Sequence, residues 1–411
     1  MSDWRDHLTR AVDRHFSEMV DLRRKLHMYP EASGEELKTS MLVYQLLGDA
    51  GYGVRLGPDG KGVIADLELQ SSESATERLA IRADIDALRI QDEKNVHYRS
   101  RVPGVMHACG HDAHTAMAVT ALKVLAEMRA QHALPIVPLV RGIFQPAEET
   151  CQGAKEMISA GALDEVAAII ALHVDPSRSV GRIGIRDGLT TANCDEICIR
   201  IQGRGGHAAR PHETRDPIVA AAQFINWLYQ QLPRTTDSLD SVVFTVGTLS
   251  GGHHANVIPD SATLRGTLRT LNSRVRENAI LLIHRIADAV AAGSETHIEI
   301  EFGLSARAVD NDLAIAQLLR NTCEATFGSE CLQEISRPSM GSEDFAYYLS
   351  EVPGAMVRLG AAGKGEKKYG LHSPMFDIHE DCLKYGARLF ATTMVEWALW
   401  KADKSRNLRT A

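Results

Sequence analysis

Residues 107–115 read HACGHDAHT and gather three histidines, a cysteine and an aspartate directly before an apolar stretch. Imidazole, thiolate and carboxylate groups are the side chains that bind transition metals. Cys109 and His111 are two positions apart, which suits a loop entering a helix, whereas His111 and His114 are three apart and share one helical face. The segment predicts a metal-binding loop at the start of a helix.

Four further polar clusters follow expected strands or lie in a loop. They are Asp84 and Asp86 on the same side of a strand, the adjacent Glu148 and Glu149 after an apolar strand, His173 at the end of another strand, and His372 in a Gly/Pro loop. Each cluster has a structural alternative, because a strand-end histidine is more often hydrogen-bonded and a lone cysteine is often a small buried hydrophobe. Two unpaired glutamates would be costly in a partly buried cleft, and bound cations would remove that cost. Together the clusters favour a metal site.

Composition and missing signatures exclude several classes of protein. The net charge of −8 gives no reason to expect nucleic acid or membrane partners. The phosphate-binding G-x-x-x-x-G-K-[ST], the G-x-S-x-G elbow and the H-E-x-x-H zinc motif are all missing from the sequence. The seven cysteines are scattered without C-x-x-C spacing, and the first residues lack the apolar region of a signal peptide, so we expect a reduced, cytoplasmic protein.

The elements that would position these clusters form two patterns. A chain of 411 residues is too long for one ordinary core, so two domains are expected. Up to about residue 187, strands alternate with helices, which predicts an α/β sheet covered on both faces. Residues 188–303 follow the order β-α-β-β-α-β of a ferredoxin-like unit, and the α/β style resumes over 304–411. The sequence thus predicts a small domain inserted into a discontinuous larger one.

A local prediction concerns the segment between the first two expected strands. The stretches 62–69 and 78–86 alternate between apolar and polar residues, and the residues between them are polar. This pattern is typical of two strands joined by an exposed hairpin loop.

At this point the motifs resemble a known family. GVMHACGHDAHTAM, FQPAEE, GGHAARPHETRDPI, NVIPD and GSEDFAYYL resemble the M20 metallopeptidases, in particular their amidohydrolase branch, from about residue 20 to 395. That branch contains hippurate hydrolases, N-acyl-amino-acid aminoacylases, N-acetyl-diaminopimelate deacetylases and auxin-conjugate hydrolases. The resemblance implies a zinc-peptidase-like α/β mixed sheet flanked by helices, with an inserted ferredoxin-like lid domain that often mediates dimers.

The resemblance also implies a set of metal ligands. The five positions that match the family's ligands are Cys109, His111, Glu149, His173 and His372. Five ligands fill two shells only if one of them bridges, and in this branch the cysteine takes that place. A thiolate suits two divalent ions such as Zn²⁺ or Mn²⁺, with Co²⁺ or Ni²⁺ as alternatives. His107 and His114 are expected to pack or to support the ligands.

Further roles follow from the same resemblance. Glu148 is the expected general base, and it would return its proton to the leaving amine. Asp84 and Asp112 would orient ligand histidines, although Asp112 could equally be a charge at a helix start.

Three residues of the expected lid match substrate-binding positions. His207 would polarise the scissile carbonyl across a dimer, and Asn256 and Arg269 would hold the oxyanion and the carboxylate of the substrate. Arg89 stands where the family usually has proline, which is either a surface change or a change in substrate selection.

The expected activity is metal-dependent hydrolysis of the amide bond of N-acyl or N-aroyl amino acids, such as hippurate-like or N-acetyl compounds. The substrate would be a small molecule that bears a carboxylate, and the protein would be a homodimer or a higher homo-oligomer. A dipeptidase or carboxypeptidase, or a hydrolytic deaminase of an aromatic amino acid-like compound, could use the same site. A non-catalytic relative is a third interpretation, but Glu148 and all five ligand positions are filled.

Overall fold

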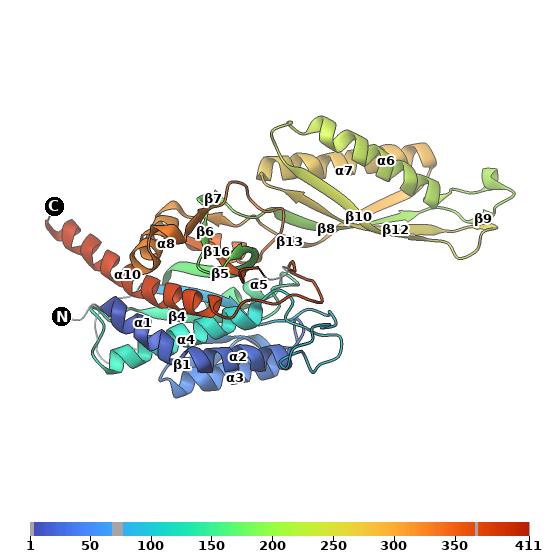
Figure 1. Cartoon of the computed structure of the whole chain (residues 1–411). Helices are drawn as coiled ribbons and strands as arrows, with labels where there is room; N and C mark the ends of the chain where they lie inside the picture. The colour runs from blue at the N-terminus through green and yellow to red at the C-terminus, as the bar shows by residue number, and fades with distance from the viewer. Residues whose placement is uncertain (1–3, 68–76, 366–368, 411) are drawn as a thin grey trace. The chain divides into compact units, whose positions relative to one another are not determined.

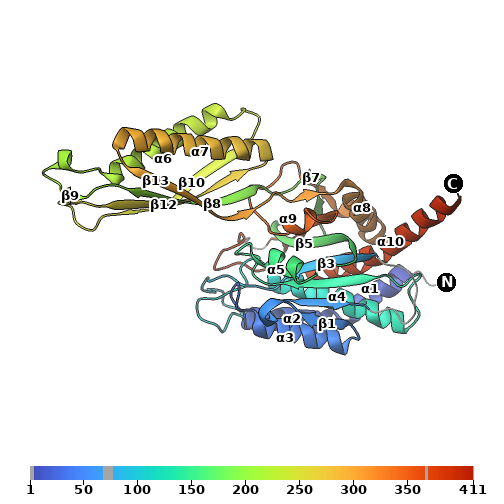
Figure 2. The same cartoon turned by 180° about the vertical axis from the view of Figure 1, so that it is seen from behind.

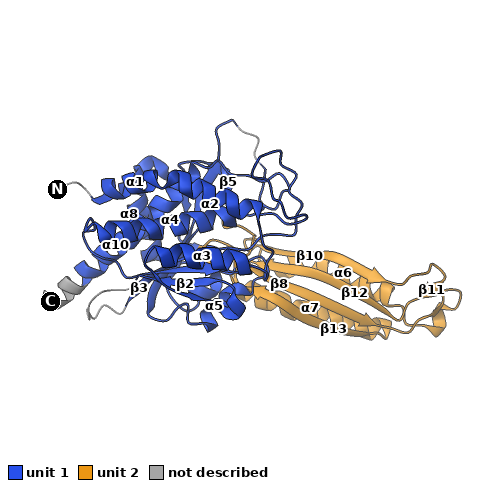
Figure 3. Ribbon diagram, turned by 90° about the horizontal axis from the view of Figure 1, so that it is seen from below, with its two compact units in different colours: residues 1–188, 310–336, 344–411 blue, residues 189–309, 337–343 orange. Residues whose placement is uncertain are grey.

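The computed structural model describes residues 4–67, 77–365 and 369–410 (Figure 1). They form two compact units, which Figure 3 distinguishes by colour. Unit 1 comprises Met1–Gly188, Asp310–Ser336 and Asp344–Ala411, and unit 2 comprises Leu189–Val309 and Arg337–Glu343.

Unit 1 is built on an eight-stranded mixed sheet flanked by helices (Figure 2). In spatial order the strands are β1 (Gly53–Leu56), β2 (Val63–Asp66), β4 (Val140–Gln145), β3 (Arg78–Asp84), β5 (Val166–Ser179), β16 (Gly354–Ala362), β6 (Ile183–Ile185) and β15 (Leu332–Glu334). The four central strands, β4, β3, β5 and β16, are mutually parallel. Their carboxyl ends therefore meet at one edge of the sheet, where α/β proteins usually place their sites.

The central strands are apolar because they are covered on both faces. Residues 166–174 of β5 read VAAIIALHV, and nearly all are buried, as expected of a strand inside a parallel sheet. The helices of unit 1 are α1 (Trp4–Arg14), α2 (Phe16–Met28), α3 (Leu37–Asp49), α4 (His111–Ala130), α5 (Gly153–Ser159), α8 (Leu313–Phe327), α9 (Ala346–Leu349) and α10 (Cys382–Thr410). Helix α4 contacts α2, α10 and β3, so the start of α4 is held between the sheet and two other helices.

The predicted hairpin between the first two strands is wrong. Strand β2 pairs antiparallel with β4, and β4 lies between β2 and β3 in the sheet. Alternation indicates a strand but does not specify its partner, and here β3 pairs in parallel with β4 after the crossover through α4. The polar tip that was predicted as a hairpin loop, residues 70–77, lies almost wholly outside the described residues.

Unit 2 contains a four-stranded antiparallel sheet and two long helices. Its main elements in chain order are β8 (Asn193–Gln202), α6 (Pro217–Thr235), β10 (Val242–Gly251), β12 (Ser261–Thr270), α7 (Ser273–Ser294) and β13 (His297–Ala306). The strand order is β10-β12-β8-β13, so β10 and β13 are the edges. Helix α6 begins where Asp216 accepts hydrogen bonds from the backbone N–H groups of Ile218 and Val219, with Pro217 at its first position.

The limits of unit 2 differ from the predicted 188–303 at two places. Strand β13 continues to Ala306, which pairs with Cys194 of β8. The segment 337–343 also belongs to unit 2, and its Gly341 carbonyl accepts a hydrogen bond from the Ala192 N–H at 3.0 Å. This segment is irregular, so no periodicity in the sequence could have revealed its partner. Among the described residues, no helix has the length and apolar character needed to cross a membrane.

Candidate metal centre

The predicted ligands come together at the carboxyl edge of the sheet in unit 1. Cys109 and His111 lie at the start of α4, Glu149 follows β4, His173 is in β5, and His372 is in the loop before α10. Cys109, His111 and His173 form one group whose ligand atoms lie within 4.8 Å of one another, and Cys109, Glu149 and His372 form another. Cys109 belongs to both groups, so the one thiol of the set lies between two sets of donors.

The distances within the cluster are those of donors around a common centre. Cys109 Sγ lies 3.4 Å from His173 Nε2, and His372 Nε2 lies 3.4 Å from Glu149 Oε1. His111 Nε2 is 3.9 Å from Glu149 Oε1 and 4.0 Å from Glu148 Oε2. Cys109, His111 and His173 are buried, whereas the side chain of His372 is half exposed, which leaves the cluster open on that side.

The hydrogen bonds of the two buried histidines leave the same nitrogen free on each. His173 Nδ1 donates to the carbonyl oxygen of Val174 at 2.8 Å, so Nε2 carries the lone pair. His111 Nδ1 lies 3.0 Å from both Asp86 Oδ1 and the Asp86 carbonyl oxygen. A histidine held in this way presents Nε2 as a metal ligand.

Two buried atoms of the cluster have no hydrogen-bond partner in the described part of the chain: His111 Nε2 and Glu149 Oε1. Buried polar atoms without partners are rare, because each loses its interaction with water. A thiolate, imidazole nitrogens and a carboxylate oxygen are together the donor set of a borderline-soft divalent ion, so the residues fit such an ion.

The charges of the cluster shift its titrations strongly. Burial lowers the pKa of His111, but the charges of Asp84 and Cys109 outweigh it and raise that pKa well above its ordinary value. The neighbouring Cys109 and Glu149 side chains raise the pKa of His372 to about 10. Burial lowers the pKa of His173 well below its ordinary value. The raised pKa values of His111 and His372 mean that their part of the cluster favours positive charge, which a metal cation can supply in place of protons.

The backbone around the cluster adopts unusual conformations. Ala147, Cys151 and His372 have positive φ angles of 51°, 52° and 64°. Such conformations are uncommon for residues other than glycine and concentrate at functional sites. Gly110, directly before α4, has φ 93°, and a Cβ there would lie 2.4 Å from Val174 Cγ2, so only glycine allows this approach of α4 to β5.

The two aspartates at the end of β3 divide the contacts that were predicted for Asp84. Asp84 accepts hydrogen bonds from His114 Nδ1 and Arg82 Nη1, both at 2.6 Å, and neither donor belongs to a predicted ligand. Asp86 Oδ1 lies 3.0 Å from Nδ1 of the predicted ligand His111, and Asp84 Oδ2 lies 3.7 Å from Nε2 of the same ring. Their shared side of the strand was visible in the sequence, but only the structure shows which carboxylate meets which histidine.

Asp112 does not orient a predicted ligand. Its Oδ2 accepts from Arg23 Nε at 2.8 Å and lies 2.7 Å from His27 Nδ1. His27 Nε2 in turn lies 3.0 Å from Lys94 Nζ. These charges are buried, and they tie the start of α4 to α2. No sequence signal identified Arg23 or His27 as partners of Asp112.

The remaining predicted residues lie in unit 2. His207 is exposed in the short strand β9 (Gly206–His207), which pairs with β11 (Val257–Ile258). The Ala208 N–H donates to the Asn256 carbonyl at 3.1 Å, so His207 and Asn256 are neighbours. Arg269 lies near the end of β12, and its Nη1 donates to the Met340 carbonyl at 2.9 Å. Their roles toward a substrate remain predictions.

Arg89, the departure from the family pattern, is on the surface of unit 1. Its side chain is 68% exposed and pairs with Glu35. This placement favours the interpretation as a surface change.

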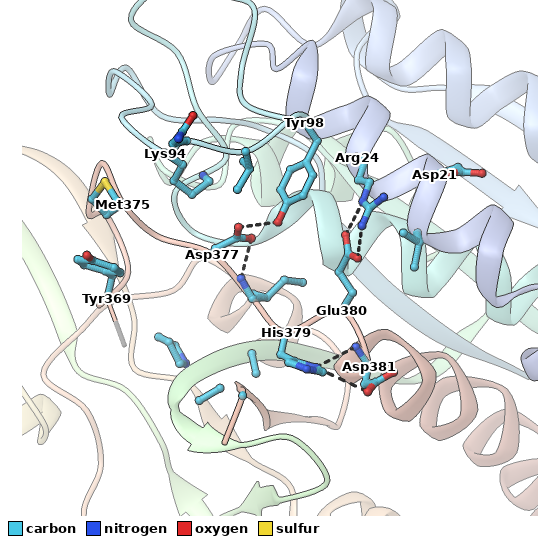
Figure 4. Close-up of a pocket in the computed structure, with 18 of the residues that line it drawn as sticks. Asp21, Arg24, Lys94, Tyr98, Tyr369, Met375, Asp377, His379, Glu380 and Asp381 are labelled. Atoms are coloured by element: carbon cyan, nitrogen blue, oxygen red, sulfur yellow. Dashed lines mark hydrogen bonds and ion pairs between the residues drawn. The ribbon is translucent and has the colours of Figure 1, made fainter. Parts of the chain in front are cut away.

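A cavity of about 770 Å³ lies in unit 1 but contains none of the predicted ligands. Figure 4 shows its lining, where Arg24 pairs with Glu380 and the Tyr98 hydroxyl donates to Asp377 at 2.7 Å. A third labelled pair is His379 with Asp381. The predicted ligands lie in the cysteine–histidine cluster and not in the lining of this cavity.

Comparisons with known proteins agree with the motifs. The family model described as Peptidase family M20/M25/M40 matches residues 80–396. A probable hydrolase from Synechocystis is 39% identical over 93% of this chain and 96% of that protein. The N-acetyl-L-cysteine deacetylase of Bacillus subtilis is 36% identical over 89% of this chain and 85% of its own. The crystal structure of a dinuclear metal-binding M20 peptidase from B. subtilis is similar with a TM-score of 0.76 and 32% identity, covering 93% of this chain and 98% of that one.

Proposed function

The chain belongs to peptidase family M20/M25/M40 and is a hydrolase of amide bonds, and on this premise we propose that its substrates are N-acyl or N-aroyl amino acids. The observation that carries the proposal is the convergence of Cys109, His111, Glu149, His173 and His372 beside Glu148. The relative that removes an acetyl group from N-acetyl-L-cysteine supports a small acyl amino acid as substrate.

Two divalent ions are proposed at the cluster, with Cys109 as the shared ligand. The two donor groups that both contain Cys109 support this arrangement, as does the dinuclear neighbour. Zn²⁺ or Mn²⁺ is proposed, with Co²⁺ or Ni²⁺ as alternatives that suit the same donors. Bound there, the ions would polarise the scissile carbonyl and lower the pKa of a water molecule to about 7.

Glu148 is the proposed general base. It is 7% exposed, its Oε2 lies 4.0 Å from His111 Nε2, and it is next in sequence to the ligand Glu149. A carboxylate in this place can take a proton from the attacking water at Oε2 and deliver it to the nitrogen of the leaving amine. Asp86 would keep His111 in the required tautomer while the proton moves.

The residues of unit 2 are proposed to bind the substrate. Arg269 would hold the carboxylate, Asn256 the oxyanion, and His207 the scissile carbonyl. A homodimer through this unit and a cytoplasmic location are part of the same proposal.

A pair of neighbouring substitutions tests the assignment of the base. Glu148→Gln should retain both ions and lower kcat by roughly 10²- to 10⁴-fold, because the amide cannot accept the proton. Glu149→Gln, the matched control, should lose an ion. Metal content by mass spectrometry and turnover of N-acetyl amino acids, hippurate, dipeptides and amino-aromatic acids are the measurements.

Three results would contradict the proposal. A Glu148→Gln enzyme with near-normal kcat would exclude Glu148 as the base. Turnover of dipeptides alone, or release of ammonia from amino-aromatic acids alone, would replace the proposed substrate class with a peptidase or a deaminase.

A further inference from the structure

His114, in the first turn of α4, is 1% exposed and uses both ring nitrogens in hydrogen bonds. Its Nε2 lies 3.0 Å from the backbone nitrogen of Val174, and its Nδ1 lies 2.6 Å from Asp84 Oδ1. A backbone N–H only donates, so Nε2 is the acceptor and Nδ1 carries the hydrogen that is donated to Asp84. Both nitrogens are thus occupied, and His114 is not a metal ligand.

Val174 is the residue after the ligand His173. The pairing of β3 with β5 ends at Arg82 and Ala171, three residues before Val174. Beyond that point a side chain, His114, accepts the hydrogen bond from the strand backbone. On one side, β5 remains paired with β16 at His173 and Val174. On the other side, where β3 no longer pairs, His114 is the acceptor that holds the peptide group between His173 and Val174. The two imidazole rings also touch edge to face, with centroids 4.8 Å apart.

Asp84 determines which nitrogen of His114 accepts. Its second oxygen, Oδ2, accepts from Arg82 Nη1 at 2.6 Å, so Oδ1 remains for His114. Asp84 and Arg82 are themselves buried. The carboxylate can only accept from Nδ1–H, which leaves the lone pair on Nε2 toward Val174.

We propose that His114 is a positioning residue for the metal centre, which holds the ligand His173 by accepting the Val174 N–H at Nε2 in the tautomer set by Asp84. The inference rests on the proposed metal centre. Of the two roles expected for the third histidine of HACGHDAHT, packing or support of the ligands, it selects support and names the atoms that provide it.

Two substitutions of His114 separate its two contacts. A glutamine carboxamide reaches roughly the position of Nε2 and can accept the Val174 N–H. An asparagine carboxamide reaches roughly the position of Nδ1 and can donate to Asp84, but it leaves the Val174 N–H without an acceptor. Mutation of a residue that hydrogen-bonds to a metal ligand typically weakens metal affinity by roughly 10- to 100-fold. We expect that loss for one ion in His114→Asn and near-normal affinity in His114→Gln.

A third substitution tests the tautomer without changing His114. In Asp84→Asn, the amide oxygen accepts the hydrogen bond from Arg82 Nη1, so the amide N–H₂ group faces His114 Nδ1. The ring must then carry its hydrogen on Nε2, opposite the Val174 N–H. Asp84→Asn should therefore weaken the same ion by a similar factor, and the double variant with His114→Asn should lose no more than either single variant.

The experiment uses Co²⁺ as the probe on the full chain. Chelator competition gives the affinity of each ion, and the thiolate-to-cobalt absorption band shows whether Cys109 still binds cobalt. Thermal unfolding of the metal-free proteins shows that each variant folds. The expected result is two ions in the wild type and in His114→Gln, and one weakened ion with the thiolate band retained in His114→Asn and Asp84→Asn.

Other outcomes overturn the inference. If folded His114→Asn binds both ions as tightly as the wild type, or if the Gln and Asn variants lose the same ion equally, His114 does not act through Val174. A wild type that binds no Co²⁺ would instead contradict the proposed metal centre itself.

Discussion

Glu36 is a fully buried carboxyl group that contacts the segment directly before Glu148. Its Oε1 accepts hydrogen bonds from the N–H groups of Gly34 and Ala147 at 2.7 and 2.9 Å, but its Oε2 has no partner among the described residues. Burial, with a smaller contribution from the Asp86 charge, raises the pKa of Glu36 to about 7. The group thus ties the segment before Glu148 to the start of α3 and favours its neutral form.

This raised pKa gives a pH dependence with a definite sign. The folded protein binds a proton at Glu36 that the unfolded chain has released between pH 4.5 and about 7, so stability falls as pH rises through this window. Relative to Glu36→Gln, which keeps an oxygen but no charge, the metal-free wild type should lose on the order of 3 kcal/mol of unfolding free energy. Urea unfolding of both proteins at pH 5 and pH 8 measures this difference. An unchanged difference at the two pH values would show that Glu36 is not perturbed.

At the scale of single residues, the sequence shows which residue types could bind a metal, but it does not show which atoms contact one another. Five ligand candidates could be named because thiol, imidazole and carboxylate groups follow expected strands in a known order. Asp86, His114 and Glu36 could not be assigned, because their roles depend on which ring nitrogen or peptide group lies opposite them. Those partners are distant in sequence, as with Asp84 and His114, and no local spacing encodes them.

At the scale of elements, α2 and α4 are joined by a buried ionic contact. The side chain of Arg23 is 0% exposed, and it bonds Asp112 of α4 through Nε and Asp377 through Nη2, both at 2.8 Å. The next residue, Arg24, is 30% exposed and pairs with Glu380. The neighbouring arginines therefore differ in burial while sharing a helix and a type of partner.

The two arginines should differ strongly when replaced. Arg23→Met leaves Asp112 buried without its cation, which should lower the free energy of unfolding by about 3–5 kcal/mol. Arg24→Met removes a partly exposed pair and should cost about 0–1 kcal/mol. Chemical denaturation of the two variants makes the comparison. Equal losses would mean that the contact between α2 and α4 is not held by Arg23.

Helices and strands were recognisable from the sequence where the apolar residues repeat with a clear helical or strand period. Which strands pair with one another was not recognisable. The apolar run of β5 and the capped start of α6 were both predictable because burial and capping act locally. The hairpin of β2 and β3 was wrong because β4, which lies between them, comes from beyond α4. The segment 337–343 joins unit 2 through backbone hydrogen bonds, which do not depend on the pattern of apolar and polar side chains.

At the scale of the molecule, the residues of unit 2 that are proposed to bind the substrate lie too far apart to contact one small substrate within a single copy. His207 and Asn256 lie beside β11, which leads into Ser261 at the start of β12, whereas Arg269 is eight residues further along that strand. Eight residues of a strand span about 27 Å. If both ends contact one substrate, as proposed, the His207 end must come from a second copy.

We propose the edge strand β10 as the surface that pairs with this second copy. Its Val243 and Leu249 are 42% and 50% exposed, and no strand pairs with its outer side among the described residues. An exposed apolar edge is a template for pairing with another chain. Leu249→Lys should convert a dimer into a monomer and lower kcat/KM at least tenfold. Leu239→Lys, at a residue that is 94% exposed outside the strand, is the control. Light scattering measures the oligomeric state, and an activity assay measures kcat/KM. A monomeric variant with full activity would contradict a substrate site that is formed by two copies.

The distance along the chain between the ligands has a consequence for biosynthesis. Roughly 200 residues separate His173 from His372, and at 5–20 residues per second a ribosome takes on the order of 10 to 40 seconds to translate them. During this interval the nascent chain carries four donors and lacks the fifth. If the five residues bind two ions as proposed, loading is complete only after His372 has been translated. A polypeptide that ends before His372 would leave the Cys109 thiol without its full set of neighbouring donors.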